Sequence, residues 1–276
     1  MTTERMAENR DFRVYAIKYA HRTGVGADEI FHEPEPTDHA GAMSYYVWLV
    51  TGHNGQFIVD TGFGRQTARR RDREDVLVGD PCEALNTLGF PAGRLDDVLL
   101  SHMHFDHCGE LDRFGNARFW LQEREMAYWT GPRASRSPGR HVVEVDDVQN
   151  LVALSLDGRV RYVDGDEEIA PGLSLHRVGG HTPGMQVVRV QTRSGPVLLA
   201  SDATHYYANM RGDRPYSGQV SVSESRTAFD RVRQLAGPDR HVVPGHDPLV
   251  IERYPAVPGL DGIAVELTDG PTAARP

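Results

Sequence analysis

The sequence predicts an α+β fold in which sheets pack in layers with helices on the outside. The predicted strands come in clusters that only a few helices interrupt, which disfavours a strictly alternating doubly wound sheet. The chain has 276 residues, enough for one layered domain to bury a large core. No repeat of about 20 to 50 residues indicates a solenoid.

The first predicted strands are β-branched and aromatic runs bounded by glycine and polar residues, at 12–20, 44–50 and 56–62. The last two are expected to form a hairpin, because the letters TGHNGQ supply turn residues between them. His53 is expected to be exposed in that turn. The connection at 21–42 is rich in proline, glycine and acidic residues, and loops of this length are usually functional.

The next element is a short helix at 81–90, with Pro81 in its first turn and Gly89 past its end. The remaining predicted elements are a strand at 96–101, helices at about 122–129 and 143–156, strands at 159–163, 173–178, 186–192 and 196–201, a helix at about 223–236 and a strand at 241–245. We expect a single domain over residues 1–276, with a core at about 12–255 and a short strand or loop and frayed tail at about 259–276.

Composition excludes several classes of protein. A net charge of -9, with 25% charged and 39% hydrophobic residues, is typical of a soluble acidic protein and not of a disordered or nucleic-acid-binding one. The five arginines at 65–75 alternate with three acidic residues, so we expect a solvated surface there. The longest apolar runs have strand length, which predicts no membrane span. The start of the chain lacks a signal-peptide pattern, and two cysteines, Cys82 and Cys108, fit a reducing compartment, so we expect a cytoplasmic protein.

The segment SHMHFDHCGE, residues 101–110, concentrates three histidines and an aspartate within six positions directly after a predicted strand. In an extended segment His102 and His104 project from one face, while Asp106 and His107 follow where the chain turns. The loop therefore presents two imidazoles in one direction and a carboxylate with an imidazole in another. This chemistry suits two zinc, iron, manganese or cobalt ions. The alternative, a chance cluster of exposed histidines, fits four candidate ligands after a buried strand less well.

Polar residues at three other strand ends are candidates to complete the site. They are His181 in GGHTPGMQ, Asp202 in LLASDATH and His246 in VVPGHDP. Each has an ordinary alternative: a turn residue, a helix N-cap and a surface histidine, respectively.

These segments resemble the metallo-β-lactamase superfamily over about residues 12–255. The letters HMHFDH at 102–107 fit its HxHxDH signature, and His181, Asp202 and His246 fall in the order of its remaining ligands. The resemblance implies a four-layer αβ/βα sandwich of two mixed sheets with helices outside.

The resemblance also implies a site for two divalent metal ions per chain, with zinc favoured and cobalt, manganese or iron as alternatives. It assigns His102, His104 and His181 to the first ion, Asp106, His107 and His246 to the second, and Asp202 as the bridge. Asp60 in VDTG would steady the metal loop, or act only as a turn-stabilising aspartate. Cys108 is expected to be a small buried residue, because the ligand set is complete without it.

Within the superfamily the chain is most similar to the N-acyl-homoserine lactonases. The commonest zinc β-lactamases carry cysteine in place of Asp202 and arginine in place of His107, and flavodiiron proteins carry glutamate in place of His104. The lactonase resemblance implies a hydrolase that opens a lactone ring, with Asp106 passing a proton to the leaving alkoxide. It also implies a homodimer, with the loop at 21–42 helping to shape the acyl-chain pocket and the dimer contact. From the residues of this loop, we expect a few of its apolar members Val25, Ile30 and Phe31 to point into the pocket.

Other functions stay open on the sequence alone. They are a thioesterase of glyoxalase II type, a hydrolase of another cyclic ester or amide, a mononuclear-iron oxygenase and a non-catalytic ligand-binding member.

One position departs from the lactonase pattern. Those enzymes have a tyrosine three residues after the bridging aspartate, where this chain has His205 followed by Tyr206 and Tyr207. Three interpretations follow. His205 replaces the phenol at the substrate carbonyl, Tyr206 reaches in instead, or the substrate is not an acyl-homoserine lactone.

Overall fold

The computed structural model describes residues 11–136, 140–237 and 241–272, and its strands form two mixed sheets. The strands are β1 (Phe12–Val25), β2 (Gly41–Gly52), β3 (Gly55–Val59), β4 (Asp97–Leu99), β5 (Arg118–Gln122), β6 (Val160–Val163), β7 (Asp166–Ala170), β8 (Leu173–Arg177), β9 (Gln186–Thr192), β10 (Gly195–Ser201), β11 (Val242–Pro244) and β12 (Ala264–Glu266). The first sheet has the order β12-β1-β2-β3-β4-β5-β6 and the second the order β11-β10-β9-β8-β7. Pairing is parallel from β3 to β6 and between β10 and β11, and antiparallel elsewhere.

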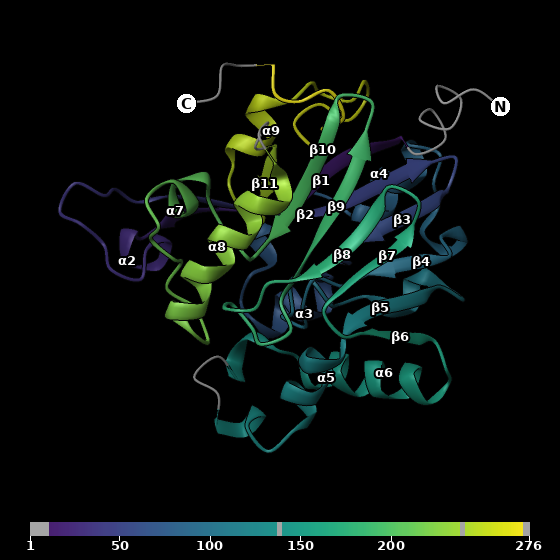
Figure 1. The fold of residues 1–276 in the computed structure, drawn as a ribbon, viewed down its shortest axis with the longest axis horizontal. Coiled ribbons are helices and arrows are strands. Elements are labelled where there is room, and N and C mark those ends of the chain that lie inside the picture. The colour runs from purple at the N-terminus through teal and green to yellow at the C-terminus, as the bar shows by residue number, and fades with distance from the viewer. Residues whose placement is uncertain (1–10, 137–139, 238–240, 273–276) are drawn as a thin grey trace.

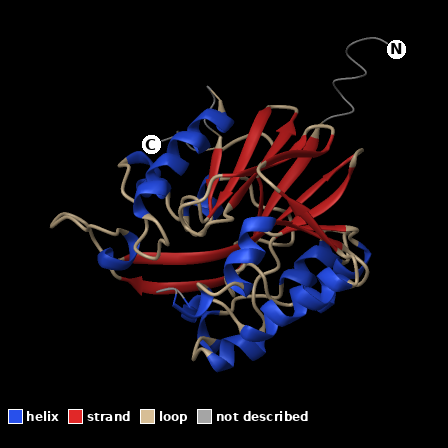
Figure 2. Ribbon diagram, turned by 60° about the horizontal axis from the view of Figure 1, so that its bottom comes forward, coloured by secondary structure: helices blue, strands red, loops and turns tan. Residues whose placement is uncertain are grey.

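Helices cover the outer faces of both sheets (Figures 1 and 2). They are α2 (Ala27–Ile30), α3 (Arg65–Arg70), α4 (Pro81–Thr87), α5 (Glu123–Thr130), α6 (Val145–Leu156), α7 (Tyr207–Arg211), α8 (Val222–Ala236) and α9 (Leu249–Arg253). Helices α4, α5 and α6 contact the first sheet, and α8 contacts β9, β10 and β11 of the second. This arrangement confirms the predicted four-layer sandwich. Among the described residues, no helix combines the length and apolarity that a membrane crossing requires.

Alternation along the strands builds two apolar layers at once. In β1, Val14 and Ala16 face the core between the sheets, whereas Tyr15 and Ile17 face the core under the helices. A third cluster joins the second sheet to α8. The single-domain organisation stays a prediction, and the shared core between the sheets agrees with it.

Most predicted elements are present with shifted boundaries. The β2–β3 hairpin pairs Gly52 with Gly55, and His53 is exposed in its turn as expected. The strand predicted at 56–62 stops at Val59, because Asp60 adopts a left-handed φ of 60°. Helix α4 begins at Pro81, and the side chain of Asp80 accepts the first free backbone N–H of the helix.

The connection predicted at 21–42 is strand at both of its ends. β1 runs on to Val25 and β2 begins at Gly41, so the two form a long ribbon that ends near α2 (Figure 1). The ring of Phe31 is buried in the core, with the Arg214 guanidinium 4.0 Å from the ring centroid, and it lines neither of the two cavities beside the predicted ligands. This position favours a packing role, and the expected role of Phe31 in a substrate pocket stays a prediction.

Several elements were not predicted. β5 lies directly before the helix expected at about 122–129, where no element was predicted, and β7 has the acidic sequence DEEIA, which lacks an apolar alternation. α3, α7 and α9 have six residues or fewer, too short for a periodic pattern. β12, by contrast, lies where a short strand or loop was expected after residue 259, and it pairs with β1, so this part of the chain extends the first sheet.

We predict that Leu267→Ala lowers the free energy of unfolding by about 2–5 kcal/mol, because the side chain fills the core between the sheets and the truncation leaves a cavity. Leu156→Ala is the matched control, since that leucine is 86% exposed on α6. Urea unfolding of both variants gives the comparison. Equal, small effects would mean that the segment after β12 adds nothing to stability.

Candidate metal centre

All seven predicted ligands converge at one edge of the sandwich. Loops that leave the carboxyl ends of the strands carry them: the loop after β4, the loop between β8 and β9, the residue after β10 and the loop after β11. Each ligand is almost completely buried. Their placement follows from topology, because β4 belongs to the first sheet and β10 and β11 to the second, so the site lies where the two sheets meet.

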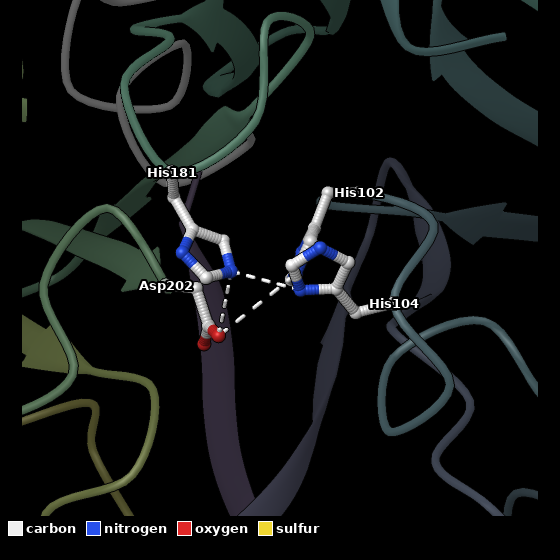
Figure 3. Close-up of side chains that lie close together, drawn as sticks. All are labelled: His102, His104, His181 and Asp202. Atoms are coloured by element: carbon white, nitrogen blue, oxygen red, sulfur yellow. Dashed lines mark hydrogen bonds and ion pairs between the residues drawn. The ribbon is translucent and has the colours of Figure 1, made fainter. Parts of the chain in front are cut away.

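The first group contains His102, His104, His181 and Asp202, whose candidate ligand atoms all lie within 4.8 Å of one another (Figure 3). His181 Nε2 lies 2.9 Å from His104 Nδ1 and 3.2 Å from Asp202 Oδ2. Asp202 Oδ2 also lies 3.8 Å from His102 Nε2. Three imidazoles and one carboxylate oxygen therefore face a common point, which is a typical donor set for zinc.

The second group contains Asp106, His107 and His246. Asp106 Oδ2 lies 3.7 Å from the Nε2 atoms of both histidines. The other carboxylate oxygen of Asp202, Oδ1, lies 3.3 Å from His107 Nε2 and 3.0 Å from His246 Nε2. Asp202 thus points one oxygen at each group, as a bridging ligand would.

Two observations test whether these residues fit metal ions. His102 Nε2, His107 Nε2 and Asp202 Oδ1 are buried yet have no hydrogen-bond partner in the described part of the protein. Buried polar atoms are rarely left unpaired, and these three, one in the first group and two facing the second, are placed as ligands of two cations would be. Burial, together with the neighbouring imidazoles, lowers the pKa of His102 and His104 well below its ordinary value, which keeps their lone pairs free. The residues fit a dinuclear site.

Asp60 fixes the metal loop, as the VDTG motif predicted. Its carboxylate accepts hydrogen bonds from the backbone N–H and the hydroxyl of Ser101, at 2.7 and 2.8 Å, and from Ser201 Oγ at 3.2 Å. His107 Nδ1 lies 2.7 Å from Asp60 Oδ2, so the ring turns Nε2 towards the site. Burial by itself would lower the pKa of His107, but the nearby carboxylates, Asp202, Asp106 and Asp60, raise it. One buried carboxylate thereby orients residues from both sheets.

The strand ends around Asp202 are locally unusual. Ser201 has a positive φ of 43°, which turns the chain sharply just before the aspartate. A side chain on Gly245 would place its Cβ 2.5 Å from Asp202 Oδ1, so only glycine fits beside the bridge. Next to it, His246 Nδ1 donates to the carbonyl oxygen of Ser44 at 2.9 Å, which directs Nε2 inwards.

Comparison with known families matches residues 40–246 to the family described as the metallo-beta-lactamase superfamily. The chain belongs to this superfamily. The resemblance predicted from the HxHxDH motif and the strand-end ligands is therefore confirmed.

Several relatives within the superfamily are lactonases. An N-acyl homoserine lactonase of a Bacillus species is 27% identical over 225 residues, covering 75% of this chain and 80% of that protein. The N-acyl homoserine lactonase AiiB of Agrobacterium fabrum is 31% identical over 200 residues, covering 67% and 69%.

Solved structures share the fold. An N-acyl homoserine lactone hydrolase with N-hexanoyl-L-homoserine at its catalytic metal centre superposes with a TM-score of 0.70 at 20% identity, covering 85% of this chain and 93% of the other. The dizinc quorum-quenching lactonase AidC superposes with a TM-score of 0.68 at 19% identity, covering 86% and 88%.

The structure separates the two residues considered for carbonyl contact. His205 lies in the cavity beside the ligands, with Nε2 3.0 Å from Asp202 Oδ2 and its ring stacked 3.7 Å from that of Tyr216. Tyr206 belongs instead to the buried apolar core and lines neither of the two cavities beside the ligands. His205, Asp202 and His246 also form a third group of candidate ligands.

Two cavities open onto this superfamily site. The larger, of about 400 Å³, has Tyr45, Arg71, Arg73, His205 and Tyr216 among its lining residues. The smaller, of about 250 Å³, is bounded mainly by apolar groups that include Trp129 and Val142. The expectation of a solvated surface at 65–75 is therefore wrong for two of its arginines, which the turn after α3 brings back over the metal loop.

Cys108 is fully buried, and it belongs to none of the candidate ligand groups among the described residues. Burial raises the pKa of its thiol well above the ordinary value, which makes it unreactive. The expectation of a small buried residue is confirmed.

Sequence reasoning missed Glu125, a fully buried carboxylate on α5. It accepts hydrogen bonds from the backbone N–H of Met103 at 3.1 Å and that of Gly184 at 3.0 Å, and from Trp129 Nε1 at 2.8 Å. Met103 lies between two ligands of the first group, and Gly184 lies three residues after the third, His181. Glu125 therefore ties together both loops that carry first-group imidazoles. Spacing alone gave no signal for it, because it lies within a helix.

We predict that Glu125→Gln weakens the affinity of the first metal site about 10- to 100-fold, because the amide nitrogen cannot accept the N–H groups that the carboxylate now accepts. Zinc titration against a competing chelator measures the affinity. Glu123→Gln is the control, since Glu123 is exposed two residues earlier on the same helix. Reduced stability with unchanged zinc affinity would limit Glu125 to a packing role.

Proposed function

We propose that the protein is a dinuclear metal-dependent hydrolase that opens the ring of lactones of the N-acyl-homoserine lactone type. The observation that carries the proposal is Asp202, which points Oδ2 at one ligand group and Oδ1 at the other. The lactonase relatives supply the substrate class, because they are similar over three quarters of the chain.

In this mechanism the side chains hold the reacting groups and move one proton. Two bound divalent cations would supply a water with its pKa lowered towards neutrality and an acid centre for the ester carbonyl. Asp202 would keep the two ligand groups in register from both sheets. Asp106 lines the larger cavity as well as facing His107 and His246, so it is placed to pass a proton to the leaving ring oxygen.

His205 is our candidate for contact with the carbonyl oxygen. Burial lowers its pKa to about 4, so the ring is neutral near pH 7 and keeps one N–H. Stacking on Tyr216 fixes the plane of the ring. A neutral ring that carries its proton on Nδ1, the nitrogen that does not face Asp202, can donate to the carbonyl oxygen on which charge develops. Tyr206 was considered for this role, and its buried position outside the cavity supports His205 instead.

The finer parts of the proposal are zinc as the resident metal, a role in quorum quenching and a homodimeric assembly. Three imidazoles with a carboxylate in the first group support zinc. The structurally similar lactonase AidC is named a dizinc quorum-quenching enzyme, which supports zinc and a role in quorum quenching. Only the family resemblance supports the homodimer.

We predict that purified protein binds two divalent metal ions per chain and hydrolyses acyl-homoserine lactones faster than thioesters. Chelation should abolish hydrolysis, and added zinc, cobalt or manganese should restore it, because the side chains alone offer no activated nucleophile. Metal analysis beside a lactone and thioester panel measures both. One iron per chain would favour an oxygenase, and a preference for thioesters would favour a glyoxalase II-like enzyme.

We further predict that His205→Ala lowers kcat on the best lactone about 10- to 100-fold while both metals stay bound. The loss is smaller than the full effect of one such donor, because a nearby cation would stabilise the same oxygen. Tyr206→Phe, the matched control from the neighbouring buried position, should lower kcat much less. Steady-state kinetics and metal analysis decide. Loss of a metal from His205→Ala would instead make His205 a ligand, and a silent His205→Ala with a damaged Tyr206→Phe would transfer the role to the tyrosine.

A further inference from the structure

The larger cavity beside the metal centre carries two arginines, Arg71 and Arg73, on its wall. An arginine needs a partner for its charge when it is partly buried, so the surroundings of each guanidinium indicate what it can bind.

Arg71 is fully engaged within the protein. Its side chain forms an ion pair with Glu144 at 2.6 Å and donates to the carbonyl oxygen of His141 at 2.8 Å. Its guanidinium also lies over the ring of Phe105, 3.8 Å from the centroid. Arg71 therefore ties the wall of the cavity to the metal loop and has little capacity left for a ligand.

The guanidinium of Arg73 has N–H groups left to donate to a ligand. Its Nη1 donates to Tyr45 Oη at 3.0 Å, and Phe105 lies 5.8 Å from the guanidinium carbon. Within residues 11–136, 140–237 and 241–272, no carboxylate forms an ion pair with it. Tyr45 in turn packs its ring edge-on against that of His246, with centroids 5.1 Å apart. One tyrosine therefore separates this cation from the second ligand group.

The acidic residues on the same cavity wall do not neutralise Arg73. Glu29 is held by Arg22 and by the hydroxyl of Tyr216. Asp106 and Asp202 face the imidazoles of the metal centre. With two divalent cations added, the cavity carries an excess of positive charge, which favours an anionic ligand.

We propose that Arg73 recognises a carboxylate on the substrate, so that the preferred lactones carry an acidic group on the acyl part, away from the ring. This inference rests on the proposed lactonase function and narrows its substrate class. The planar guanidinium can pair with a carboxylate through two parallel N–H donors while Tyr45 holds it in place. A neutral hydrocarbon chain would leave that charge without a partner.

The test compares two lactones of equal length whose acyl chains end in a carboxylate or in a primary carboxamide. Wild-type protein should prefer the carboxylate about 10- to 100-fold in kcat/KM, mainly through KM, as expected for a hydrogen bond to a charged group. The preference should shrink as salt concentration rises. Arg73→Met should reduce the ratio to about one, and Arg73→Lys should keep part of it. Arg69→Met is the control, since Arg69 is exposed and pairs with Glu74 outside the cavity.

Calorimetric binding of the same two compounds separates the two levels of the proposal. Hydrolysis of both lactones at equal kcat/KM, in wild type and Arg73→Met alike, would overturn the inference and leave the lactonase function standing. Carboxylate binding that Arg73→Met abolishes, without hydrolysis of any lactone, would overturn the function and support the inference. Carboxylate binding of equal strength in both proteins would place the carboxylate on the metals and overturn the inference.

Discussion

The shared carboxylate of Asp202 is the constraint on which the rest of the centre depends. Its two oxygens face two groups of ligands, and each group combines residues from both sheets, so the sheets must meet at one edge with little freedom. Two local features follow from this demand: the positive φ of Ser201 and the absence of a side chain at Gly245. Burial alone would raise the pKa of this carboxyl group. The surrounding imidazoles outweigh that effect and hold the pKa well below its ordinary value. Metal cations bound between these ligands would stabilise the buried negative charge of Asp202 further.

Buried carboxylates around the ligands give the site its rigidity. Asp60 holds the ends of β4 and β10 through the serine next to each ligand segment, and Glu125 joins the two loops of the first group. Both act through backbone N–H groups or a neighbouring side chain, and both are fully buried. Such supports resist displacement because breaking any one bond leaves an unpaired group in a dry interior. Hydrogen bonds within the protein therefore hold the ligand segments in position.

The ligands could be predicted from the sequence because their signal is local: four lie within six residues, and the others follow apolar strand runs. The layered fold could be predicted because the β-branched and aromatic strand runs come in clusters that only a few helices interrupt. Glu125 and Arg73 could not be predicted, because their roles arise only when distant segments meet. Arg73 belongs to a charged run that usually indicates solvent, and only the turn after α3 brings it over the metal loop. The burial of Phe31 could not be predicted either, because a long polar connection hid a strand extension and a buried ring.

The central claim is that Asp202 joins two metal ions in one site. Anomalous diffraction from crystals of the zinc-loaded protein tests it most directly, because it locates each ion independently of any assay. The account predicts two zinc peaks about 3.5–4 Å apart, one beside each ligand group, with an oxygen of Asp202 bound to each. A single peak, or two peaks that leave Asp202 unbound, would contradict it.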